Sequence, residues 1–122
     1  DDLANLVPAR LTAAAYIVAA ALCGRDVATL WSVLRRDGRA TASPNAGLPM
    51  SAVAGALGIE LGKEGHYHLG AGLRRADRRD IGRGVTLMWV AVAITAAGLG
   101  LASRISRGGL RWASGGAERC SR

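Results

Sequence analysis

The stretch "GVTLMWVAVAITAAGLGLAS", residues 84–103, decides the fold because it contains no charged side chain and is bounded by Arg83 and Arg104. At about 1.5 Å of rise per residue, a helix over this stretch is about 30 Å long, the thickness of the hydrocarbon core of a bilayer. Gly98 and Gly100 would weaken a helix in water, but membrane helices tolerate glycine. The stretch therefore predicts a transmembrane helix over residues 84–103.

A second apolar run, "LTAAAYIVAAALCG", residues 11–24, is shorter and by itself also suits a buried core helix. Extending it toward the N-terminus includes Arg10, whose long side chain can reach the membrane interface from one turn inside a helix. Pro8 is compatible with the first turn of such a helix. We therefore expect a second transmembrane helix over residues 6–24, and an all-α integral membrane fold with short interfacial or re-entrant helices.

The segment between the two runs contains one amphipathic pattern, "VATLWSVLRRDGRA", residues 27–40. Its apolar residues recur at the three-and-four spacing of a helix, and arginines follow them. Such a helix either lies in the membrane interface through its apolar face or is an ordinary solvated helix, and the sequence leaves both open.

A net charge of +7, from 16 basic and 9 acidic residues, suits nucleic acid, an anionic membrane surface or a phosphate-bearing substrate. The arginines flank membrane-like runs, and no recognition motif accompanies them, so we expect no nucleic-acid partner. The Gly-, Ser- and Arg-rich residues 104–122 predict a disordered basic tail. His66 and His68 have no further His or Cys nearby, so we expect no metal site at this pair.

The stretch "ATASPNAGLPMSAVAGALG", residues 40–58, begins with a polar turn in which Pro44, Asn45 and Gly47 favour a sharp change of direction. Pro49 fits the first turn of a helix that runs to about Ile59. This arrangement would put Asn45 and free N–H groups at a helix N-terminus, where partial positive charge suits phosphate or carboxylate.

Small residues recur four apart within this predicted helix, at Ser51 and Gly55 and again at Ala54 and Gly58. A face with almost no side chain lets another backbone approach closely or leaves room for a bulky ligand. Plain helix packing is the simpler of the two interpretations.

Three ordered motifs resemble a known family: "DDLANLVPARLTA" (1–13), "SPNAGLPMSAVAGALGIELG" (43–62) and "RRDIGRGVTLMWVAV" (78–92). Together they resemble the C-terminal part of the CobD/CbiB cobalamin biosynthesis family, the adenosylcobinamide-phosphate synthases, over residues 1–103. The resemblance implies a multi-pass enzyme of the inner or plasma membrane. That enzyme would join aminopropanol or its phosphate to a carboxylate of adenosylcobyric acid through an amide bond, with ATP and Mg²⁺.

The family's N-terminal half, with further membrane helices, has no counterpart in this sequence. We therefore expect a C-terminal fragment, or a truncated member of the family, that needs the missing N-terminal part of the same enzyme for activity. The family usually has Trp and Glu at two positions where this chain has Leu48 and Met50.

The substrates implied by the resemblance are anionic, so the site candidates are residues that supply cationic or N–H partners. The substrate-binding candidates are Asn5, Arg10, Ser43, Pro44, Asn45, Gly47, Pro49 and Gly55. For Mg²⁺, which prefers carboxylate oxygens, the candidates are Asp2, Asp37 and Asp80. No residue is assigned a catalytic role.

An alternative function follows from the two apolar runs and the charge of +7 alone. A small, non-enzymatic basic membrane protein could bind anionic lipid or an acidic partner through its arginines.

Overall fold

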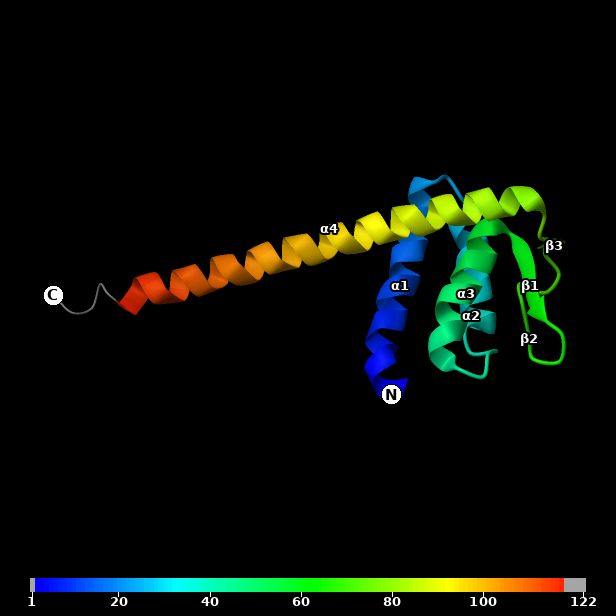
Figure 1. Cartoon of the computed structure of the whole chain (residues 1–122), viewed down its shortest axis with the longest axis horizontal. Helices are drawn as coiled ribbons and strands as arrows, with labels where there is room; N and C mark the ends of the chain where they lie inside the picture. The colour runs from blue at the N-terminus through cyan, green and yellow to red at the C-terminus, as the bar shows by residue number, and fades with distance from the viewer. Residues whose placement is uncertain (1, 118–122) are drawn as a thin grey trace.

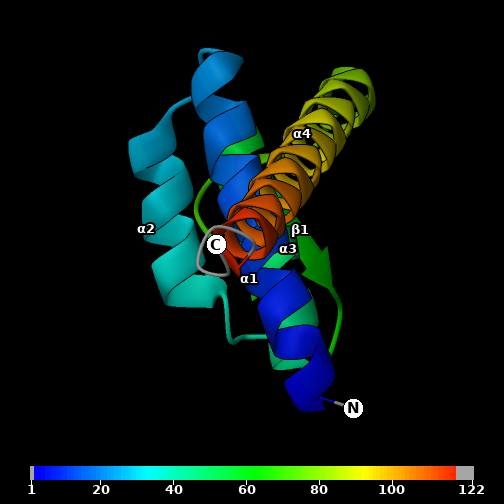
Figure 2. The same cartoon turned by 90° about the vertical axis from the view of Figure 1, so that its left-hand side faces the viewer.

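The computed structural model describes residues 2–117, which form helices and one small sheet (Figure 1). In chain order the elements are α1 (Asp2–Leu22), α2 (Val27–Asp37), α3 (Pro44–Leu57), β1 (Ile59–Lys63), β2 (Tyr67–Leu69), β3 (Arg74–Arg75) and α4 (Arg78–Ala117). Helices α1, α2 and α3 pack on one another, and the sheet lies at one flank of this bundle (Figures 1 and 2). Helix α4 crosses one end of the bundle and continues well beyond it.

Helix α2 confirms the amphipathic pattern and shows what its apolar face contacts. Asp26 caps the helix, because its Oδ1 accepts the N–H groups of Ala28 and Thr29 at 3.0 and 3.2 Å. Leu30 and Val33 are buried, and the helix packs mainly on α3. Leu30 and Val33 are therefore used within the protein, whereas Trp31 on the same face is half-exposed, and its placement in a membrane interface or in water stays a prediction.

Helix α3 begins at Pro44, five residues before the predicted start at Pro49. Ser43 is the N-cap residue, and Pro44 takes a first-turn position, where its missing N–H has no intrahelical partner to lose. The predicted turn is thus the first turn of the helix, and Pro49 lies inside it. Gly58 ends the helix in the left-handed conformation, with φ of 63°.

The small-residue face of α3 packs directly against the backbone of α2, as the spacing predicted. A Cβ atom placed on Gly55 would lie 2.5 Å from the Cα of Leu30, closer than real side chains approach. Alanines fill most of the remaining core: Ala15, Ala19 and Ala20 of α1, Ala56 of α3 and Ala91 of α4 surround Leu30 and Leu87. A chain without Phe can therefore pack its helices closely because their contact surfaces are nearly flat.

The expectation of an all-α fold is wrong in one segment, since residues 59–75 form a three-stranded sheet of order β2-β1-β3. Strand β1 pairs antiparallel with β2, with Leu61 opposite Leu69, and parallel with β3, with Ile59 opposite Arg74. Gly65, at φ of 74°, makes the turn between β1 and β2. Leu69 joins Val33 and Ala54 in a second apolar cluster, which attaches the sheet to α2 and α3.

Helices α1 and α4 differ from the predicted spans at their ends. Helix α1 begins at Asp2 rather than near residue 6, so Pro8 lies in its interior, and it ends at Leu22. Helix α4 runs to Ala117, so residues 104–117 are helical where a disordered tail was expected. Residues 118–122 of that tail lie outside the described residues.

Both α1 and α4 are long and apolar enough to cross a membrane by length and composition. Only 28% of the apolar window of α1 and 11% of that of α4 are buried, so within this structure α4 is not the core helix of a globular domain. Large apolar side chains stand exposed along α4, including Trp89, Val92, Leu99 and Leu101. The two helices cross steeply instead of running side by side (Figure 1).

Replacing Gly55 with Ala tests the contact between α2 and α3. The added methyl group would overlap the Leu30 backbone, so the helices must move apart, and we expect a loss of about 1–3 kcal/mol in the free energy of unfolding. Denaturant unfolding followed by circular dichroism in detergent measures it. Gly98→Ala is the control, since nothing lies within 4 Å of its Cβ position, and we expect equal or greater stability. Equal stability of the two variants would contradict the contact.

Candidate substrate-binding groove

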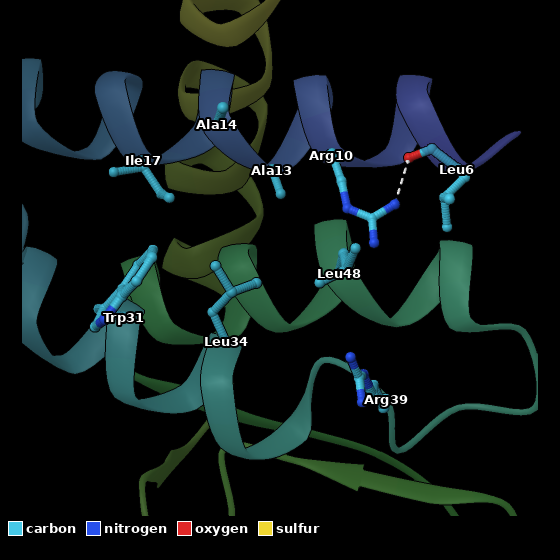
Figure 3. Close-up of a pocket in the computed structure, with 9 residues that line it drawn as sticks. All are labelled: Leu6, Arg10, Ala13, Ala14, Ile17, Trp31, Leu34, Arg39 and Leu48. Carbon is cyan, nitrogen blue, oxygen red and sulfur yellow. Dashed lines mark hydrogen bonds between the residues drawn. The ribbon is translucent and has the colours of Figure 1, made fainter.

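A groove of about 580 Å³ opens between α1, α2 and α3 (Figure 3). One face of α1 forms its first wall, and α2, the loop after α2 and the first turns of α3 form the opposite side. The lining residues are Leu6, Arg10, Ala13, Ala14, Ile17, Trp31, Leu34, Arg39 and Leu48. The groove is therefore apolar along its length, with arginines at one end and Trp31 at the other (Figure 3).

The two arginines enter the groove from different elements. Arg10 extends from α1, and its Nη1 donates to the carbonyl oxygen of Leu6 over 3.5 Å, while Arg39 comes from the loop after α2 (Figure 3). Among the side chains that the structure describes, neither guanidinium has a carboxylate within 4.0 Å. Guanidinium groups bind carboxylate and phosphate oxygens through paired N–H donors. The groove therefore suits a ligand with an anionic end and an apolar body.

The SPNAG motif shapes the loop that carries Arg39. A Cβ atom on Gly47 would overlap the carbonyl oxygen of Gly38, so only glycine lets α3 start this close to the end of α2. The hydroxyl of Thr41 donates to the carbonyl oxygen of Ser43 over 2.5 Å and closes the loop. These contacts hold Arg39 and Leu48 on the same side of the groove, opposite α1.

The substrate-binding candidates from the sequence divide between the groove and the structure around it. Arg10 lines the groove, whereas Asn5 is exposed in the first turns of α1. Ser43, Pro44 and Asn45 form the start of α3, and Asn45 is half-buried there. The remaining candidates, Gly47, Pro49 and Gly55, lie in α3, where the two glycines permit close backbone contacts.

Sequence reasoning missed the role of Arg39 and Trp31 in this groove. Arg39 belongs to a basic cluster, and nothing in the spacing of residues 27–40 shows which arginine turns toward α1. Leu48, one of the two departures from the family pattern, also lines the groove, whereas Met50 packs against the cluster of Val33, Ala54 and Leu69.

Asp37, a metal candidate, is a buried structural carboxylate. It pairs with Arg36 through two hydrogen bonds of 2.8 and 2.9 Å, and its Oδ2 accepts the Gly70 N–H at 2.7 Å. The hydrogen bond from Arg36 is the main cause that holds the pKa of Asp37 below its ordinary value, against the opposing effect of burial. This side chain thus connects the end of α2 to the residue that follows β2.

Asp80, the second metal candidate, lies four residues before the uncharged stretch 84–103. Both of its carboxylate oxygens also accept hydrogen bonds within the protein. Arg74 donates to both of its carboxylate oxygens, at 2.5 and 2.7 Å, and the Asp77 N–H adds a bond of 2.9 Å. Arg83 lies 3.4 Å away. These donors, Arg74 foremost, lower the pKa of Asp80 well below its ordinary range, so the ion pair holds β3 to the start of α4.

The described residues do not assemble a Mg²⁺ site by themselves. Over residues 2–117 no three His, Cys, Asp or Glu side chains whose positions the structure describes gather around one point. Asp37 and Asp80 bind different arginines in different parts of the fold, and the third candidate, Asp2, stands at the start of α1.

The fold and the groove define a mostly helical protein with long apolar helices and a groove lined by two arginines. The sequence profile of the family described as CobD/Cbib protein matches residues 1–88, and the chain belongs to this family. The family match does not favour the alternative of a non-enzymatic basic membrane protein.

Several curated relatives carry the name cobalamin biosynthesis protein CobD. The one from Geobacter metallireducens is 51% identical over 67 residues, which are 55% of this chain and 21% of that protein. The one from Klebsiella pneumoniae is 39% identical over 105 residues, covering 80% of this chain and 33% of that protein. The chain thus spans between about a fifth and a third of their length. No solved structure matches the chain significantly.

Replacing Asp37 with Asn tests its structural role through pH. Because the folded-state pKa lies below the ordinary 3.8, the carboxylate stabilises the fold above that pH and loses this effect as the pH falls through the folded-state pKa. Asn keeps the shape but not the ion pair with half-exposed Arg36, so we expect a loss of about 1 kcal/mol at pH 7. The difference in the free energy of unfolding between the variant and the wild type should become smaller below pH 3.8.

Unfolding curves at pH 7 and pH 3 measure this difference. Glu64→Gln removes an exposed carboxylate in the turn between β1 and β2 and serves as the control. A deficit of Asp37→Asn that is the same at both pH values would contradict a role for its charge.

Proposed function

We propose that this chain is the part of a CobD enzyme that helps to attach aminopropanol, or its phosphate, to adenosylcobyric acid. In that reaction the amine nitrogen bonds to the carbon of a propionate carboxylate, the nitrogen loses a proton and one carboxylate oxygen leaves. The product is adenosylcobinamide or its phosphate. The chain covers only a part of its relatives, so the complete enzyme, rather than this segment alone, would carry out the reaction.

The observation that carries this proposal is the placement of Arg10 and Arg39 in one groove inside the family-matched region. The corrinoid presents a carboxylate, and the amine presents a phosphate when it is the phosphorylated form. Two guanidinium groups without carboxylate partners among the described side chains would attract and orient such oxygens. The apolar walls and Trp31 would lie against the uncharged body of a substrate.

The carboxylate needs activation before an oxygen can leave, and the family resemblance implies ATP and Mg²⁺ for this purpose. The described carboxylates do not fit a Mg²⁺ site, because Asp37 and Asp80 are held by arginines. We therefore propose that Mg²⁺ and nucleotide bind in the part of the enzyme that this chain does not cover.

The enzyme would be a multi-pass protein of the inner or plasma membrane, and α4 is the element of this chain best suited to cross it. Its apolar window is the less buried of the two candidates, and residues 84–103 carry no charge. Helix α1 is the second candidate by length and composition, and Val7, Leu11 and Val18 stand exposed on it.

Complementation tests the proposed role of the groove. The complete gene that carries this segment, with Arg10→Gln or Arg39→Gln, is placed in a strain lacking the synthase, and growth is measured without added cobinamide. Each lost guanidinium removes a charge-assisted contact, so we expect KM for the anionic substrate to rise about 10- to 100-fold and growth to fall.

Arg35→Gln is the matched control, because Arg35 is an exposed arginine of α2 that does not line the groove. Immunoblotting of the membrane fraction shows whether each variant is produced. Wild-type growth of both groove variants would refute their role in binding, and failure of the unmodified gene to replace cobinamide would refute the proposed reaction.

A further inference from the structure

A second cleft, separate from the groove, is lined by residues of the connection between α1 and α2 and of the first turns of α4. It has a volume of about 530 Å³. Its lining residues are Cys23, Arg25, Arg79, Gly82, Arg83, Thr86 and Leu87. It shares no lining residue with the groove that contains Arg10 and Arg39.

The arginines of this cleft converge from two segments of the chain. Arg79 and Arg83 are four residues apart and project from one face of α4, and Arg25 comes from the connection after α1. Arg83 has a carboxylate partner, Asp80, at 3.4 Å, but that carboxylate binds Arg74 more closely. Among the described side chains, Arg25 and Arg79 have no carboxylate within 4.0 Å. The cleft therefore holds an excess of positive charge that the fold does not neutralise.

We propose that this cleft binds a phosphate group. Guanidinium groups from two sides can each offer paired N–H donors to phosphate oxygens, and phosphate has enough oxygens to accept from all of them. Neither Arg25 nor Arg79 belongs to the apolar cluster between α1 and α4, whose buried members on these two helices are alanines and Leu87.

The position of the cleft favours a phospholipid headgroup as the source of the phosphate. Two of its lining residues, Thr86 and Leu87, belong to the first turn of the uncharged stretch 84–103, and Arg79 and Arg83 lie just before that stretch. If α4 spans the membrane, the arginines lie at the depth of the lipid phosphates. This assignment of the source rests on the proposed membrane span, whereas the phosphate site itself does not.

Cys23 provides a reporter inside the cleft, because it is exposed and lines it. The Cys120→Ser variant leaves Cys23 as the only thiol of the chain. In dodecyl maltoside micelles, alkylation of Cys23 is followed while phosphatidylglycerol, phosphatidylcholine or inorganic phosphate is added at matched ionic strength. We expect phosphatidylglycerol to slow the alkylation several-fold and phosphatidylcholine to have little effect.

Arg25→Gln combined with Arg79→Gln should weaken this protection at least about tenfold in lipid concentration, since two charge-assisted contacts are lost. Arg75→Gln combined with Arg78→Gln removes the same charge outside the cleft and should retain the protection. Equal behaviour of the two double variants, or no protection by any phosphate, overturns the proposal.

Protection by inorganic phosphate at lower concentration than by the lipid supports the phosphate site and assigns it a soluble ligand. The measurement needs neither catalysis nor a bilayer. Its failure therefore leaves the proposed reaction untouched, and failure of complementation by the groove variants leaves the cleft untouched.

Discussion

The contact between Gly55 and the backbone of Leu30 is the constraint on which the rest of the structure depends. It brings α3 against α2 without an intervening side chain. At the other end of the same interface Gly47 meets the carbonyl group of Gly38, so α2 and α3 approach closely at both ends. The position of Arg39 in the groove follows from this interface, since its loop is the link between the two helices. The second apolar cluster, which attaches the sheet, forms on the same pair of helices.

Local structure could be predicted from the sequence where one pattern, such as the absence of charge or a regular spacing of small residues, extends over a whole segment. The charge gap over 84–103 predicted a helix there, and the four-residue spacing of Ser51 and Gly55 predicted close packing on α3. Pro44 occupies the first turn of α3 in the structure, although Pro49 by itself fits a first turn equally well. The predicted helical architecture was correct for most of the chain and wrong for residues 59–75, whose strands are too short for a clear alternation.

The parts that could not be predicted depend on contacts between distant residues. Asp37 accepts a hydrogen bond from Gly70, 33 residues away, and only this contact shows that a carboxylate beside three arginines is structural. Arg39 lines the groove beside α1 because of the course of the loop between α2 and α3. No sequence pattern within residues 27–40 predicts that course. Arg10 is distinctive in the sequence because it is a single charge next to an apolar run. Arg39, in contrast, is one of three clustered arginines that the sequence does not distinguish.

The alanine-rich core has a consequence for how this protein tolerates change. Ala19, Ala20, Ala52 and Ala54 are completely buried, and few large side chains are. Substitution of a core residue by a smaller one usually lowers stability, but the side chains of this core are already close to the smallest possible. A methyl group added at Gly55 instead meets a neighbouring backbone. Alanine scanning would therefore find the contacts of Gly47 and Gly55 but would pass over those of the buried alanines, which only a larger side chain such as valine or leucine would reveal.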